Sequence, residues 1–222
     1  DIKTFHSYCF DLLGKPGNLT EADNIIKDAT QKILNGEVEP SKITKSVLVL
    51  DEAQDMDESN YNLVKALMAA NPDMRVIAVG DDDQNIFEFR GSSSKYMQAF
   101  ITDFNAKKYE MCDNYRSASS IVALANAFVL NLPNRMKSTS IRSINNESGT
   151  VQIIRHTTKY MEVAVIEHLM HTYHGENACV LTTTNEKAMQ VQTLLSQKHI
   201  KSKLIQNNEN IKLRDLEEVR HF

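Results

Sequence analysis

The apolar positions along the chain follow two spacings, one typical of helices and one typical of buried strands. Two continuous apolar runs, 47–50 and 76–79, predict strands that are buried on both faces of a parallel sheet. The helical pattern at 58–70 lies between them and ends at Asn71-Pro72, a normal stop signal. Strand, helix and strand in this order form a βαβ unit, which predicts an α/β fold with a parallel sheet.

Other segments continue the alternation of helices and strands. The further predicted helices cover residues 5–13 and 20–35, from Ser92–Ser94 to about residue 100, from Ser117 to about residue 130, and residues 160–173 and 186–198. The further predicted strands cover residues 151–154, 178–182 and 202–205. Residues 131–150 are mostly polar and are interpreted as a linker. The segment beyond them is a second α/β stretch, too short to form a complete domain.

Composition is that of an ordinary globular protein: 222 residues, of which 41% are apolar and 24% are charged. No apolar run reaches the roughly 18 residues of a membrane span, so no membrane partner is expected. The three cysteines are far apart and odd in number, which favours a reducing cytoplasm over a disulfide framework. The chain starts without Met or a secretory signal, which suggests a piece cut from a longer protein.

The acidic residues are unevenly distributed, and two clusters indicate a site. The net charge of −4 argues against a generally basic protein that coats nucleic acid. The surplus acid lies in residues 51–58 and 81–83, each directly after a predicted strand. Because the connection between parallel strands is a crossover, both strand ends are expected at the same edge of the sheet, where α/β proteins bind ligands.

The first cluster offers two adjacent carboxylates at the end of a strand. Asp51 can hold Mg²⁺ beside the phosphates of a nucleotide, and Glu52 can orient or deprotonate an attacking water. The alternative is an acidic loop that also caps the next helix.

The second cluster is followed by an aromatic and basic loop. Gln84 can hydrogen-bond a γ-phosphate or the attacking water without adding charge. Phe87, Phe89 and Arg90 are suited to stacking on bases and holding phosphate. The alternative is that Phe87 and Phe89 pack into the core.

The order of these motifs resembles that of the UvrD/Rep/PcrA group of superfamily 1 helicases. The matching segments are Thr4-Phe-His-Ser7, Asp51-Glu-Ala-Gln-Asp55, Gly80-Asp-Asp-Asp-Gln-Asn-Ile-Phe-Glu-Phe-Arg-Gly-Ser92, Asn114-Tyr-Arg-Ser117 and Ala178-Cys-Val-Leu-Thr-Thr-Thr-Asn185. The resemblance implies a RecA-like sheet of the P-loop NTPase class. Residues 1–135 would be part of a first RecA-like domain, 136–150 a linker, and 151–222 part of a second.

The resemblance also implies roles for individual residues, with ATP and Mg²⁺ as cofactors and single-stranded DNA or a single-strand/duplex junction as partner. Asp51 would position Mg²⁺, and Glu52 would be the catalytic base. Gln84 would sense the γ-phosphate, and Arg116 would neutralise charge on the transferring phosphoryl group. The remaining contacts would be Tyr115 against the nucleotide base and Phe5, His6, Phe87, Phe89 and Arg90 along the DNA path. Such a machine would act in DNA repair or recombination.

Several positions depart from the family pattern. Phe89 stands where a Trp is usual, Phe87 where a Tyr is usual, and Thr183 where an Arg is frequent. No Gly-x-x-x-x-Gly-Lys-Ser/Thr loop occurs, so the isolated chain is expected not to turn over ATP at a useful rate. An alternative is a non-catalytic DNA-binding or interaction module with a degenerate helicase core. A receiver-type phosphoacceptor site would leave the Phe87–Arg90 loop unexplained.

Overall fold

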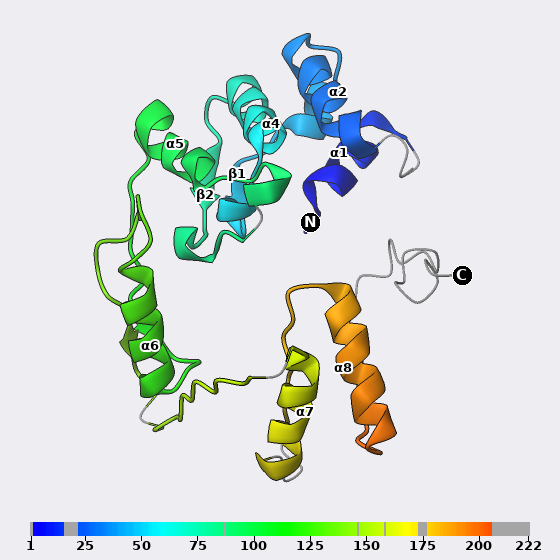
Figure 1. Cartoon of the computed structure of the whole chain (residues 1–222). Helices are drawn as coiled ribbons and strands as arrows, with labels where there is room; N and C mark the ends of the chain where they lie inside the picture. The colour runs from blue at the N-terminus through cyan, green and yellow to red at the C-terminus, as the bar shows by residue number, and fades with distance from the viewer. Residues whose placement is uncertain are drawn as a thin grey trace. The chain divides into compact units, whose positions relative to one another are not determined.

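The computed structural model of the chain describes residues 2–15, 22–86, 88–145, 147–157, 159–172 and 177–205. The chain divides into two compact units, Asp1–Val151 and Gln152–Phe222 (Figure 1). Over the described ranges, none of the helices has the length and apolar character needed to cross a bilayer.

The first unit is built around the expected βαβ arrangement. Strand β1 (Val47–Leu50) pairs in parallel with β2 (Arg75–Ala78), with Leu50 opposite Ala78. Helix α4 (Glu58–Ala70) connects them and lies next to both strands in Figure 1. The Asp57 side chain accepts a hydrogen bond from the Asn60 N–H and caps this helix. The predicted α/β class with parallel strands is confirmed.

One face of this strand pair is covered, and the other is not. Leu48 and Val76 pack against the buried clusters, whereas Val47, Val49 and Ile77 are about half exposed or more. The prediction that these strands are buried on both faces is therefore wrong for this chain. Successive side chains of a strand point to opposite faces, and the helices that contact β1 and β2 bury only one of them.

The covered face packs against a group of helices. Helices α1 (Phe5–Leu13), α2 (Ala22–Leu34), α3 (Pro40–Ile43) and α4 contribute side chains to one apolar cluster. Ile25 and Leu63 are fully buried there, and burial of such a side chain contributes roughly 1.5–3 kcal/mol. The expected helix at 5–13 is confirmed, and a Gly14 C-cap in the left-handed region ends it.

A second cluster forms where α5 (Ser94–Phe104) packs against the 3₁₀ helix η1 (Ala53–Asp55). Phe100 and Tyr61 contact each other edge to face in this cluster. The chain then forms the short strand β3 (Asp113–Asn114), helix α6 (Ser119–Val129) and strand β4 (Arg142–Ser143), with β3 and β4 in parallel. The sequence pattern did not indicate either short strand.

The expected linker belongs to the first unit, where its backbone forms hydrogen bonds with side chains of α6. The amide nitrogen of Asn126 on α6 donates to the Ile141 carbonyl oxygen, and its amide oxygen accepts from the Ile141 N–H. The Ser120 hydroxyl donates to the carbonyl oxygen of Gly149. That residues 136–150 join two RecA-like domains stays a prediction.

The second unit contains helices α7 (Met161–Thr172) and α8 (Asn185–Gln197), which pack side by side through Ile166, Val191 and Leu195. Residues 151–154, 178–182 and 202–205 are described and form no strand, so the three predicted strands are wrong for this chain. Ile153, Leu181 and Ile205 within them are exposed. A strand is stable only when a neighbour pairs with its backbone, and no strand among the described residues pairs with these segments.

Candidate functional site

The ends of β1 and β2 are tied together by main-chain hydrogen bonds. The Val79 N–H donates to the Leu50 carbonyl oxygen at 2.8 Å, and the Ala53 N–H donates to the Val79 carbonyl oxygen at 2.9 Å. The chain therefore leaves both strands at one edge of the sheet. Asp51 and Glu52 follow the first strand there, and the Asp81–Gln84 segment follows the second, as the sequence predicted.

Gln54 joins these two segments through its side chain. Its amide nitrogen donates to Glu52 Oε2 at 2.8 Å, and its amide oxygen accepts from the Asp81 N–H at 2.9 Å. The residue is only 3% exposed, so both ends of the amide need partners. Sequence reasoning gave Gln54 no role. The sequence offered one sign of this role: Gln54 is the single amide residue in the acidic segment 51–58 that follows the first strand.

Gly80 leaves room for the Gln54 side chain. A Cβ atom at this position would lie 2.6 Å from Gln54 Oε1 and 2.9 Å from Met97 Sδ. Both distances are shorter than van der Waals contact, so a larger residue would displace the Gln54 amide. The glycine is thus required by a close approach of side chains.

The two carboxylates of the first cluster lie in a strained turn. Glu52 has φ 50° and ψ 44°, in the left-handed region that residues with a side chain adopt at a cost of about 1–2 kcal/mol. Its N–H donates to Asp51 Oδ1 at 3.0 Å. Both residues are exposed, and Mg²⁺ in proteins takes one or two carboxylates and keeps several waters. The donor set of this turn therefore fits a magnesium ion bound through Asp51.

Asp55 adds a half-buried carboxyl next to this turn. Burial raises its pKa, and the negative charge of Glu52 raises it further. Its Oδ1 atom is buried and has no hydrogen-bond partner. Burial and the charge of Glu52 therefore both disfavour a negative charge on Asp55.

The second cluster holds Gln84 through an aspartate. The 3₁₀ helix η2 (Asp82–Gln84) begins after Asp81, whose side chain accepts from the Asp83 N–H and caps it. The Gln84 amide nitrogen donates to Asp81 Oδ2 at 2.7 Å. The carboxylates of residues 81–83 are close enough together for a cation. However, Asp83 already pairs with Arg135, Asp81 pairs with Lys137, and Asp82 accepts from a backbone N–H of the same segment. Their role is to anchor a second segment of the chain.

A separate turn presents the predicted nucleotide contacts. The Asn114 side-chain oxygen accepts from the N–H groups of Arg116 at 3.0 Å and Ser117 at 2.7 Å. This leaves Tyr115 71% exposed and Arg116 exposed as well. Among the described residues, no hydrogen bond or ion pair joins Arg116 to Asp51 or Gln84, so these predicted site residues are not linked to one another directly.

The predicted DNA contacts lie in different surroundings. Phe89 is 78% exposed in the 3₁₀ helix η3 (Glu88–Arg90), and His6 is exposed on α1. Phe5 is half-buried and packs against both core clusters of the first unit. Phe87 and the side chain of Arg90 lie outside the described residues.

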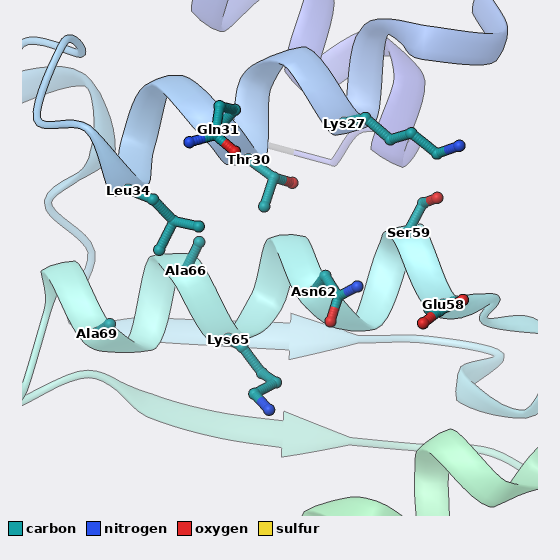
Figure 2. Close-up of a pocket in the computed structure, with 10 residues that line it drawn as sticks. All are labelled: Lys27, Thr30, Gln31, Leu34, Glu58, Ser59, Asn62, Lys65, Ala66 and Ala69. Atoms are coloured by element: carbon teal, nitrogen blue, oxygen red, sulfur yellow. The ribbon is translucent and has the colours of Figure 1, made fainter.

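The first unit also has a groove of about 550 Å³ between α2 and α4. Figure 2 shows that Lys27 and Thr30 line it from α2, and Asn62 and Lys65 from α4. None of its lining residues belongs to the predicted site.

Sequence comparison agrees with the arrangement of these motifs. Residues 41–105 match the UvrD/REP helicase N-terminal domain, and residues 109–221 match the UvrD-like helicase C-terminal domain. The chain therefore belongs to the UvrD/Rep-like helicases of superfamily 1, which confirms the resemblance seen in the sequence.

The chain is similar to several bacterial helicases. It is 32% identical to the ATP-dependent DNA helicase Rep of Buchnera aphidicola subsp. Schizaphis graminum over 130 residues, 57% of this chain and 19% of that protein. It is also 32% identical to Rep of Escherichia coli over 133 residues, 57% and 20% of the two chains. It is 37% identical to DNA helicase II of Escherichia coli over 90 residues, 40% and 12%. The chain thus spans 12% to 20% of the length of these relatives.

Proposed function

We propose that this chain forms part of an ATP-dependent DNA helicase or translocase that couples hydrolysis of Mg-ATP to movement on single-stranded DNA. The observation that carries this proposal is the shared edge of β1 and β2. Asp51, Glu52 and Gln84 lie at this edge, and Gln54 ties Glu52 to the backbone of Asp81. Family membership supports the same activity, and parts of two RecA-like domains, residues 1–135 and 151–222, would supply the fold.

The residues at this edge divide the chemistry between them. When bound, Mg²⁺ and ATP would supply the reactive phosphoryl group and offset its charge. Asp51 offers an exposed carboxylate to the ion. Glu52 accepts a proton from the attacking water, and the bond from Gln54 to its Oε2 atom restricts its rotation. Gln84 senses the γ-phosphate through its amide.

Two more residues act from the Asn114–Ser117 turn. Arg116 neutralises charge on the transferring phosphoryl group, and Tyr115 lies against the nucleotide base. Both are exposed on a turn held by Asn114, which supports a role in contacting a ligand. Closure of this turn toward the strand ends when nucleotide binds would complete the site.

The DNA would run along the loop that follows Gln84. Phe89 is exposed enough to stack on a base, a contact worth about 1–3 kcal/mol per base. Phe87, Arg90, His6 and Phe5 would line the same path, on single-stranded DNA or at a junction. We place this activity in DNA repair or recombination in the cytoplasm, where reducing conditions suit three free cysteines.

The test is DNA-stimulated ATP hydrolysis by the full-length gene product that contains these residues. Glu52→Gln is expected to lower kcat at least about 100-fold and to leave binding of a single-stranded oligonucleotide unchanged. Glu167→Gln, an exposed glutamate on α7, is the matched control and should retain full activity. Hydrolysis that survives Glu52→Gln would contradict the proposed base. DNA binding with no hydrolysis in the unmodified protein would support a non-catalytic binding module instead.

A further inference from the structure

Three consecutive residues that follow α6 pair with three consecutive aspartates at the end of β2. The two segments pair in opposite directions. Arg135 Nε and Nη2 donate to the two carboxylate oxygens of Asp83 at 2.7 Å each. The Met136 N–H donates to Asp82 Oδ2 at 2.5 Å, and Lys137 Nζ donates to Asp81 Oδ1 at 2.5 Å. More than fifty positions of sequence separate the partners. The motif that contains Gln84 is thus held by a segment that the sequence pattern marked as a linker.

These contacts are shielded from water. The Asp83 side chain is 7% exposed and the Lys137 side chain 15%. Arg135 presents two parallel donors to one carboxylate, the strongest geometry for such a pair. The hydrogen bond from Arg135 lowers the pKa of Asp83, against the effect of burial. Burial alone would lower the pKa of Lys137, but the hydrogen bond to Asp81 and the charges of Asp81 and Asp83 raise it overall.

One carboxylate connects Lys137 to Gln84. Asp81 Oδ1 accepts from Lys137 Nζ, and Asp81 Oδ2 accepts from Gln84 Nε2 at 2.7 Å. A carboxylate is planar, so the cation that fixes one oxygen also fixes the direction of the other. Three adjacent aspartates would otherwise repel one another and leave the turn less defined.

We propose that Arg135 and Lys137 are positioning residues for Gln84, because they hold the Asp81–Asp83 turn so that Asp81 orients the Gln84 amide. This proposal rests on the proposed function of Gln84 as a γ-phosphate sensor. A displacement of residues 135–137 would then change the orientation of the Gln84 amide, although residues 135–137 themselves do not contact the nucleotide.

The first experiment follows the side-chain amide signals of Gln84 by ¹⁵N nuclear magnetic resonance in the 222-residue chain. Lys137→Met is expected to shift these signals and to speed their hydrogen exchange, whereas Lys137→Arg keeps the charge and should restore them. Lys187→Met is the matched control, because Lys187 forms an ion pair on the helices of the second unit. Gln84 signals that stay in place in Lys137→Met would overturn the proposal.

A second measurement needs no substitution, in case Lys137→Met fails to fold. In the unmodified chain, the Lys137 ε-methylene protons should show a nuclear Overhauser contact to the Asp81 β protons. Absence of this contact in a folded chain would also overturn the proposal.

The consequence for activity is measured in the full-length gene product. Lys137→Met is expected to lower kcat for DNA-stimulated ATP hydrolysis about tenfold, with KM for ATP unchanged, since Lys137 acts on orientation and not on binding. Equal kcat values for the two proteins would contradict the positioning role. If the unmodified protein shows no hydrolysis, the proposed function fails, and the resonance experiment still decides whether Lys137 orients Gln84.

Discussion

The Gln54 side-chain oxygen accepts a hydrogen bond from the Asp81 backbone N–H over 2.9 Å, across the gap between two strand ends. The same amide donates to Glu52, so one buried side chain fixes the relation between both acidic segments. A glutamine can do this because its amide carries a donor and an acceptor. The proposed catalytic base is therefore positioned by a residue that itself contacts neither substrate nor metal in the proposed mechanism.

Gln54→Ala should destabilise the first unit. The substitution leaves the Asp81 N–H without its side-chain partner and opens a small space, which together are expected to lower the free energy of unfolding by about 1–3 kcal/mol. Urea unfolding followed by circular dichroism measures this change. Gln31→Ala, on an exposed face of α2, is the control and should lie within about 0.5 kcal/mol of the unmodified chain. Equal losses for the two variants would show that the Gln54 bridge contributes nothing.

Gly80→Ala should lower the free energy of unfolding, mainly because the new methyl group would clash with the Gln54 side chain. The new methyl group would lie 2.6 Å from Gln54 Oε1, and overpacking of this kind costs about 1–3 kcal/mol. In the double variant Gly80→Ala/Gln54→Ala the clash with the amide is gone. Its loss of unfolding free energy should therefore be smaller than the sum of the two single losses. Strict additivity in the urea midpoints would argue that the methyl group clashes elsewhere, at Met97.

Glu52 has a left-handed backbone conformation that a glycine would adopt without strain. Glu52→Gly and Glu52→Ala both remove the carboxylate and the bond from Gln54, so their difference reports the backbone alone. The glycine variant is expected to be more stable by about 1 kcal/mol, in spite of the greater freedom of glycine in the unfolded chain. Thermal unfolding of the two variants side by side checks this. An alanine variant of equal or greater stability would show that the turn relaxes out of the left-handed region.

The sequence alone was sufficient for the local part of this fold. The helix at 5–13 and the first strand at 47–50 were predicted with the bounds that the structure shows. Their signals, apolar periodicity and capping residues, lie close together in the sequence. The shared edge of the two strands followed from the parallel crossover that connects them, because parallel strands end at the same edge of a sheet. Family motifs then supplied roles for the residues at that edge.

Long-range contacts were beyond this reasoning. Nothing near Arg135 in the sequence indicates that it pairs with Asp83, and the acidic run was interpreted as a ligand site before its cationic partners were known. The predicted strands at 151–154 and 178–182 have the right residues, but no strand in the part of the chain that the structure describes pairs with them. A strand depends on a partner elsewhere in the chain, so composition alone cannot predict it.

Alkaline pH should destabilise the first unit through Tyr61. Burial raises the pKa of Tyr61 to about 12, and its hydrogen bond to Asp103 raises it too, from an ordinary value of 10.0. In the unfolded chain the phenol loses its proton near pH 10, whereas in the folded chain it keeps it. The stability that this group contributes is therefore complete below pH 10 and is lost as the pH rises toward about 12.

Tyr61→Phe removes the titrating hydroxyl and should make the decline of the urea midpoint between pH 9.5 and 12 shallower. Tyr109→Phe is the control, because Tyr109 is exposed and its loss should leave the decline unchanged. Some decline will remain in Tyr61→Phe, since burial also raises the pKa of Tyr8 and raises that of Cys9 to about 12. A decline as steep as that of the unmodified chain would mean that Tyr61 ionises equally in the folded and unfolded states, and its burial against Phe100 would then have no effect on its titration.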